Sequence, residues 1–148
     1  MKKFSYLLMA AFAVMCVCSS CSKDEDGKID SNSIVGTWKA VSEEGYSICD
    51  GEKEEWNNPY DEDEYFTLTF NANGTGSTVD IYGDETTNKD DFTWRLSGNN
   101  LGIKFEGETE EVGKVEKLTS TQLVVVYEWV SSDGKEKEYN KTTFTRVK

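Results

Sequence analysis

The side chains most often used in catalysis and metal binding are scarce in this chain. None of the 148 residues is a histidine, which removes His-based triads, most general-base schemes and most zinc sites. Cys49 has no histidine partner, so we expect it to be a small buried hydrophobic residue rather than a nucleophile. No glycine-rich phosphate-binding loop is present. The sequence therefore predicts neither an enzyme nor a bound cofactor.

Carboxylates are the abundant functional groups. Acidic runs at Asp61–Glu64 and between Asp84 and Asp91 offer oxygen ligands for Ca²⁺. Neither run has the ligand spacing of a helix–loop–helix calcium loop, and adjacent acids in a strand or loop point apart. Nothing in the pattern places two carboxylates across a cleft, as glycoside hydrolysis requires. We expect solvated acidic loops and no metal site.

Aromatic side chains are the remaining candidates for binding. Trp56, Tyr60 and Tyr65 lie in or beside the stretch from Asp50 to Glu64, which has no core pattern and is predicted to be a loop or lid. These rings are predicted to frame a binding site for an apolar or sugar ligand. Four more aromatic residues follow in alternating patterns, and they either line an interior cavity or simply fill a core: Phe66, Phe70, Trp94 and Phe105.

The elements that position these side chains are β-strands. From Tyr65 onward, short alternating runs are separated by turn residues, and Asn73-Gly74 is typical of a tight hairpin. The apolar residues of Val112–Leu118 are out of phase, which indicates a bulge. Gln122–Val130 is apolar on both faces and is predicted to be the most buried strand.

The number and spacing of these runs predict the fold class. No stretch after the N-terminal segment has helical periodicity, and eight or nine short strands joined by local turns indicate an all-β antiparallel up-and-down meander. Closing such a meander into a β-barrel removes its edges. A sandwich remains the alternative, although sandwiches usually need longer connections.

The N-terminus predicts export. Lys2-Lys3 precede an apolar run that is shorter than the about 20 residues of a membrane-spanning helix, so residues 1–20 are predicted to be a signal peptide. Ser19-Ser20-Cys21 resembles a bacterial lipoprotein signal, which implies that Cys21 carries the lipid. An ordinary secretory signal with a free thiol at Cys21 is the alternative.

The segment after Cys21 indicates a location. Residues 21–33 are predicted to be a flexible tether, and residues 34–148 the folded domain. The acidic run Ser22–Asp26 resembles the export signal of Bacteroidetes surface lipoproteins, which implies an outer-membrane lipoprotein exposed at the cell surface. A merely solvated linker is the alternative.

Net charge limits the partners. The full chain has 16 basic and 28 acidic residues, and the predicted signal peptide contains two of the basic ones. Nucleic acid and anionic lipid head groups bind basic patches, so neither is an expected partner. The only expected membrane contact is the lipid anchor, and a monomer is expected.

One motif resembles a known family. Gly36-Thr37-Trp38, near the start of the meander, resembles the Gly-x-Trp motif of the lipocalins. Together with Leu68–Gly76 and Phe144-Thr145-Arg146, it is similar to the lipocalin-like lipoproteins of Bacteroidetes. The resemblance implies a barrel closed at one end by Trp38, with Arg146 either stacked on that ring or solvated at the C-terminus.

The resemblance also implies a function. The leading hypothesis is an outer-membrane-anchored lipocalin-like protein that binds a small hydrophobic or amphipathic ligand. The alternative is a filled barrel that acts as a protein-interaction or accessory module of an envelope complex. An eight-stranded barrel either fills its interior or holds one small ligand, and the sequence leaves both open.

Overall fold

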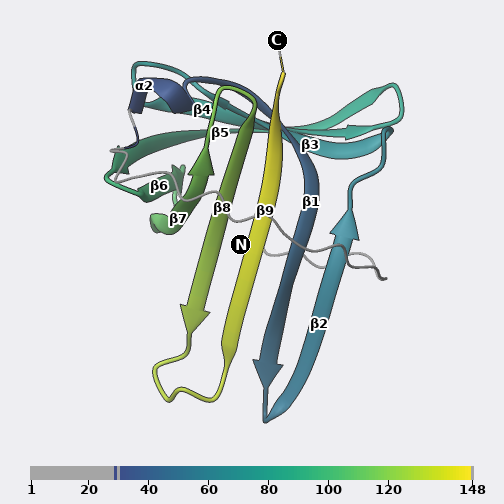
Figure 1. The fold of residues 1–148 in the computed structure, drawn as a ribbon, viewed down its shortest axis with the longest axis vertical. Coiled ribbons are helices and arrows are strands. Elements are labelled where there is room, and N and C mark those ends of the chain that lie inside the picture. Colours follow the sequence, from purple (N-terminus) through teal and green to yellow (C-terminus); the bar gives the residue numbers. More distant parts are fainter. Residues whose placement is uncertain (1–28, 30, 148) are drawn as a thin grey trace.

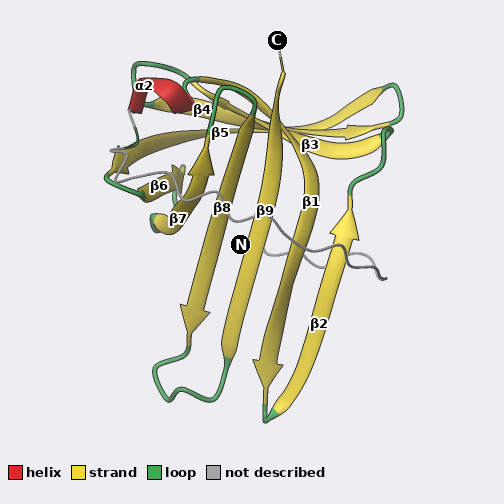
Figure 2. Cartoon of the chain, viewed as in Figure 1, coloured by secondary structure: helices red, strands yellow, loops and turns green. Residues whose placement is uncertain are grey.

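The computed structural model describes residue 29 and residues 31–147. Within these residues the chain forms nine strands and one helical turn, α2 (Ser31–Ile34). The strands are β1 (Gly36–Cys49), β2 (Glu52–Pro59), β3 (Glu64–Phe70), β4 (Thr75–Tyr82), β5 (Glu85–Ser97), β6 (Asn100–Phe105), β7 (Glu111–Leu118), β8 (Gln122–Val130) and β9 (Lys137–Val147). Figure 2 shows this all-β composition. The predicted signal peptide and Cys21, and most of the predicted tether, lie outside the described residues.

All nine strands form one antiparallel sheet that closes on itself. Strands β3 to β9 pair in chain order, and β9 returns to pair with β1, so eight strands form a closed barrel with β2 as an extra strand. In Figure 1, β8, β9, β1 and β2 run side by side, and β3, β4 and β5 cross them at one end. The predicted up-and-down barrel is confirmed.

Strand β1 pairs with three other strands. Along one edge it pairs first with β3, from Gly36 to Lys39, and then with β2, from Ser42 to Cys49. Along the other edge it pairs with β9, with a register shift between Ala40 and Ser42. This β-bulge at Val41 adds one residue, and therefore changes which residues of β1 face the interior.

The apolar core fills the end of the barrel near α2, which we call the closed end. Its side chains come from nearly every strand and alternate along each of them. The largest fully buried ones are Trp38, Phe70, Ile34, Leu101, Leu123, Val115 and Val125. Phe70 makes edge-to-face contacts with Phe92 and Trp94, with ring centroids 5.6 and 5.4 Å apart. This half of the interior is packed rather than open.

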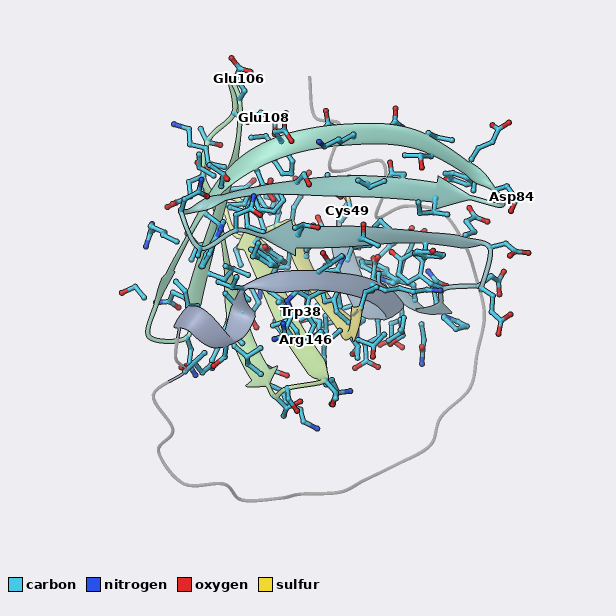
Figure 3. The ribbon with its side chains drawn as sticks, turned by 90° about the horizontal axis from the view of Figure 1, so that it is seen from above. Trp38, Cys49, Asp84, Glu106, Glu108 and Arg146 are labelled. Carbon is cyan, nitrogen blue, oxygen red and sulfur yellow. The ribbon has the colours of Figure 1, made fainter. Side chains whose placement is uncertain are left out.

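Trp38 and Arg146 hold the closed end together. The Trp38 indole is fully buried and donates a hydrogen bond to the Ile34 carbonyl at 2.8 Å. The Arg146 guanidinium lies 4.1 Å from the Trp38 ring centroid and donates to the carbonyl of Val35 at 2.8 Å. Figure 3 labels the two side chains next to each other. In the structure Arg146 therefore lies stacked on Trp38 and is not solvated at the C-terminus.

Gly36 is required by this contact. Its φ of +135° is disfavoured for other residues, and a Cβ there would lie 2.5 Å from Nη1 of Arg146. Glycine thus lets the guanidinium reach the backbone at the start of β1.

Two segments differ from the sequence-based expectations. The predicted loop or lid after Asp50 is instead mostly strand β2, whose inward residues are polar or amphipathic and so lack an apolar alternation. The expected polar turn from Gly83 to Asp91 is a tight turn followed by the start of β5. The hairpin at Asn73-Gly74 and the bulge in β7 are confirmed.

Among the residues that the structure describes, no helix is long and apolar enough to span a membrane. The strands define the domain, with the predicted boundary near residue 34 falling at the end of α2.

Arg146→Ala tests the closed-end contact. The variant loses the cation–π contact and the hydrogen bonds from a charged donor, so we expect the free energy of unfolding to fall by about 2–4 kcal/mol. Urea denaturation measures this. The control is Arg95→Ala, which removes an exposed ion pair with Glu110 and is expected to lower the free energy of unfolding much less than Arg146→Ala does. Equal losses in the two variants would contradict a special role for Arg146.

Candidate functional site

Polar side chains occupy the inner face of the barrel at the end opposite α2, which we call the open end. They come from β1, β2, β4, β9 and the residue just after β2. We call this set the open-end cluster: Glu43, Trp56, Asn58, Tyr60, Asp80 and Asn140. In Figure 1 the open end is where β1, β2, β8 and β9 extend away from α2.

Strand register aligns one wall of the site. Across the inner face, Glu43 lies between Asn58 of β2 and Thr142 of β9. In the next row, Gly45 lies between Trp56 and Asn140. The Trp56 ring covers Gly45, because a Cβ at this glycine would lie 2.8 Å from the ring. The absence of a side chain at position 45 thus makes room for the indole.

Glu43 is the centre of the hydrogen bonding. It is only 3% exposed, and its carboxylate accepts hydrogen bonds from the Tyr60 hydroxyl at 2.8 Å and from Nδ2 of Asn140 at 2.9 Å. Burial raises the pKa of Glu43, while these two donors lower it in part and the charge of Glu138 raises it further. The Trp56 N–H also lowers this pKa from nearby, although it does not have the geometry of a hydrogen bond. The carboxylate is held in place but poorly solvated.

The facing wall is formed by β3 and β4. Phe66 and Asp80 are direct cross-strand partners, and Asp80 is 5% exposed. Its only side-chain hydrogen bond, from Nδ2 of Asn88, is long at 3.5 Å. Burial raises the pKa of the Asp80 carboxyl, and Asp90 adds to this effect.

Tyr60 connects the two walls. Its hydroxyl donates to Glu43, and its ring meets Phe66 edge-to-face with centroids 5.5 Å apart. Burial, Glu43 and, more weakly, the charge of Asp80 raise the pKa of the Tyr60 hydroxyl, so it remains a neutral donor. The two buried carboxylates therefore lie on either side of one tyrosine.

Four buried polar atoms in the described part of the chain have no hydrogen-bond partner, and all four belong to the open-end cluster. They are Nε1 of Trp56 and the side-chain oxygens Oδ1 of Asn58, Asp80 and Asn140. A buried polar group left unpaired costs about 1–3 kcal/mol, and native proteins hold few of them. Their concentration at one end of the barrel marks this end as the candidate site.

The charges of the site have one sign. Glu111 and Glu138 share the inner face with Glu43, and Asp90 shares it with Asp80. The lysines and arginines of the described strands alternate to the outer face, apart from Arg146 at the closed end. No fixed positive charge in the described strands therefore offsets the carboxylates at the open end.

The predicted binding residues separate into three groups. Trp56 and Tyr60 belong to the cluster, and Phe66 packs against it. Phe70, Trp94 and Phe105 lie among the side chains of the closed-end core. Tyr65 points to the outer face, where the Lys39 ammonium lies 3.6 Å from its ring centroid.

Four residues of the cluster were not predicted, namely Glu43, Asn58, Asp80 and Asn140. Strict alternation from Trp38 places Glu43 on the outer face, and the bulge at Val41 reverses this. Asp80 and Asn140 lie in β4 and β9, whose polar residues face inwards at the open end. A strand that packs on a core has apolar residues in these positions, so its pattern does not identify them. The sequence did contain one indication of Asp80, because Gly76, Thr78 and Asp80 alternate along β4 and therefore share one face of the strand.

Cys49 does not lie where it was predicted. It is exposed at the end of β1, beside the turn at Asp50 and Gly51, and Figure 3 shows it among the labelled residues. The charges of Asp50 and its acidic neighbours raise the pKa of the thiol, which disfavours a reactive thiolate. In the described residues, no group of three potential ligand side chains is arranged to hold a metal ion.

Comparisons with known proteins agree with this architecture. The sequence model of the lipocalin-like domain family matches residues 34–125. No curated protein sequence is significantly similar to the chain.

Among solved structures, an uncharacterised protein from Bacteroides eggerthii has a TM-score of 0.50 at 11% identity, over 76% of this chain and 98% of that one. A lipocalin-like protein from Bacteroides uniformis has a TM-score of 0.49 at 17% identity, over 78% and 99%. Bovine odorant binding protein in complex with a selenium-containing odorant has a TM-score of 0.43 at 21% identity, over 86% and 78%.

Glu43→Gln tests the electrostatics of the site. Burial raises the pKa of Glu43 in the folded protein. At any pH above the pKa that Glu43 has in the unfolded chain, its carboxylate therefore lowers the stability of the fold, and glutamine removes this cost. Rotation of the Asn140 amide would turn its unpaired Oδ1 towards the new donor at position 43. We expect the variant to be more stable than wild type by on the order of 1 kcal/mol at pH 7, with an advantage that shrinks towards pH 4.

Urea unfolding at several pH values measures this difference. Glu44→Gln is the matched control, because Glu44 lies one residue further along on the outer face, 3.2 Å from Lys141. We expect this control to show no gain. An advantage of Glu43→Gln that grew as the pH fell would show that its hydrogen bonds outweigh the effect of burial.

Proposed function

The chain belongs to the lipocalin-like domain family, and on that premise we propose that it binds a small amphipathic ligand at the open end of the barrel. The observation that carries this proposal is the concentration of unpartnered buried polar atoms in the open-end cluster. A ligand that pairs with these atoms would recover free energy that the protein alone does not.

The surrounding rings support an amphipathic ligand. Trp56, Tyr60 and Phe66 are each half-buried, so part of each ring remains available for contact. Aromatic rings beside a few fixed polar atoms are the usual composition of a small-molecule site. The packed closed end leaves the ligand's apolar part to these rings rather than to a deep apolar channel.

We propose further that the protein acts at the outer membrane. This rests on the sequence alone: the signal peptide, Cys21 in a lipoprotein-like context and the acidic run that follows it. Lipidation at Cys21 would tether the barrel to the membrane, and the acidic run would direct it to the cell surface. The ligand would then be taken from the medium outside the cell.

Trp56→Ala tests ligand binding. The full-length protein is extracted from its native membrane, and co-purifying small molecules are identified by mass spectrometry. Loss of the indole removes about 1–2 kcal/mol of contact, so we expect recovery of the ligand to fall about tenfold or more. Tyr46→Ala is the control, because Tyr46 stacks on Tyr139 on the outer face. If repeated wild-type preparations yield no ligand, a filled barrel that binds proteins becomes the better hypothesis.

Cys21→Ser tests the anchor. We expect the wild-type protein to fractionate with outer membranes and the variant to be released into the soluble fraction, because the lipid is the only proposed attachment. Immunoblotting of the separated fractions measures this. The control is Cys49→Ser, which changes an exposed thiol inside the folded domain. Unchanged membrane fractionation of Cys21→Ser would refute lipidation at this residue.

A further inference from the structure

We infer that the ligand of the open-end cluster is an organic cation, a protonated amine joined to a small apolar body. This inference rests on the proposed function, because it assigns a chemical class to the ligand of the same site. Three independent features of the cluster carry it: the unpaired atoms, the charges and the rings.

The unpaired atoms are mostly acceptors. Oδ1 of Asn58, Asp80 and Asn140 all lack a donor, and Trp56 Nε1 is the only unpaired donor. Asp80 and Asn140 are 5% and 3% exposed, so their oxygens are directed into the protein interior rather than into bulk solvent. An ammonium group has three donors and no acceptor, which matches this inventory.

The charges favour a positive partner. Glu43 and Asp80 are buried carboxylates on facing walls, and Tyr60 lies between them and is close enough to both to be affected by their charges. Buried charges in proteins are normally paired, since an unpaired one carries a large desolvation cost. No lysine or arginine of the described strands faces the open end, and a bound cation is the partner that we infer for these charges.

The rings suit a cation with an apolar body. Trp56 and Tyr60 flank Glu43, and Phe66 lies beside Asp80. A cation above such ring faces is attracted by the negative charge of the ring face, most strongly when the cation is desolvated. A bare divalent metal gains less from this site, because in the described residues no three candidate ligand side chains converge. An anion would face the carboxylates of the inner face, among them Glu43, Asp80, Asp90, Glu111 and Glu138.

Three probes of matched shape test the charge preference. The full-length protein is held in phosphatidylcholine nanodiscs and titrated by calorimetry at pH 7 with 2-phenylethylamine, 2-phenylethanol and 3-phenylpropionate. Empty nanodiscs correct for partitioning. We expect the amine to bind at least tenfold more tightly than the alcohol, and the carboxylate to show no binding.

Two variants locate the effect. Asp80→Asn removes one charge from the inner face of β4, and we expect it to reduce the preference for amine over alcohol to less than threefold. Asp91→Asn removes the same charge from the outer face of the neighbouring strand β5, and we expect the preference to stay unchanged. Thermal unfolding of both variants verifies that they are folded.

Each contrary result has a distinct meaning. Equal binding of amine and alcohol would overturn the cationic class while leaving ligand binding at the open end intact. Binding of none of the probes would overturn the inference, and the native-membrane extraction would still decide the proposed function. Equal losses in Asp80→Asn and Asp91→Asn would assign the preference to general surface charge. Displacement of the amine by one equivalent of Ca²⁺ would assign the site to a metal instead.

Discussion

The bulge at Val41 determines which side chains of β1 enter the barrel. Before it, Trp38 and Ala40 face the interior, and after it the inward position falls on Glu43. A shift of one residue exchanges the two faces of a strand, so an unbulged β1 would direct Glu44 inwards and Glu43 to the surface. The bulge also coincides with the point where β1 changes partner from β3 to β2. One extra residue thus separates the apolar closed end from the polar open end.

Stability and binding are consequently assigned to different ends of the same strands. The closed end contains the fully buried apolar side chains and the contact between Arg146 and Trp38. The open end contains the unpaired polar atoms and the buried carboxylates, each of which costs stability. A barrel whose core is complete at one end tolerates such groups at the other. The unsatisfied groups lie where a ligand would offset their cost.

The sequence predicted the fold better than the site. The hairpin at Asn73-Gly74 follows from local turn chemistry, whereas the closing pair Trp38 and Arg146 was implied by the resemblance of Gly36-Thr37-Trp38 to the lipocalin motif. Strand β2 was missed because its inward residues, such as Trp56 and Asn58, face a polar cluster and not a core. Alternation also fails in β4, where Asp80 faces inwards and the apolar residues Val79 and Ile81 face outwards. Binary patterning identifies cores, so it fails where the interior is a site.

The positions of the charges in the barrel say more about function than the net charge of the chain does. Acids on the outer face have cationic neighbours, as Glu44 has Lys141 and Glu110 has Arg95. The acids of the inner face at the open end have none in the described strands. If acidity served solubility alone, the buried positions 43 and 80 would gain nothing from a charge, because a buried carboxylate contributes little to hydration of the surface and costs stability. Their charge is useful only in the presence of a positive group that is not part of the described domain, and a bound organic cation supplies one.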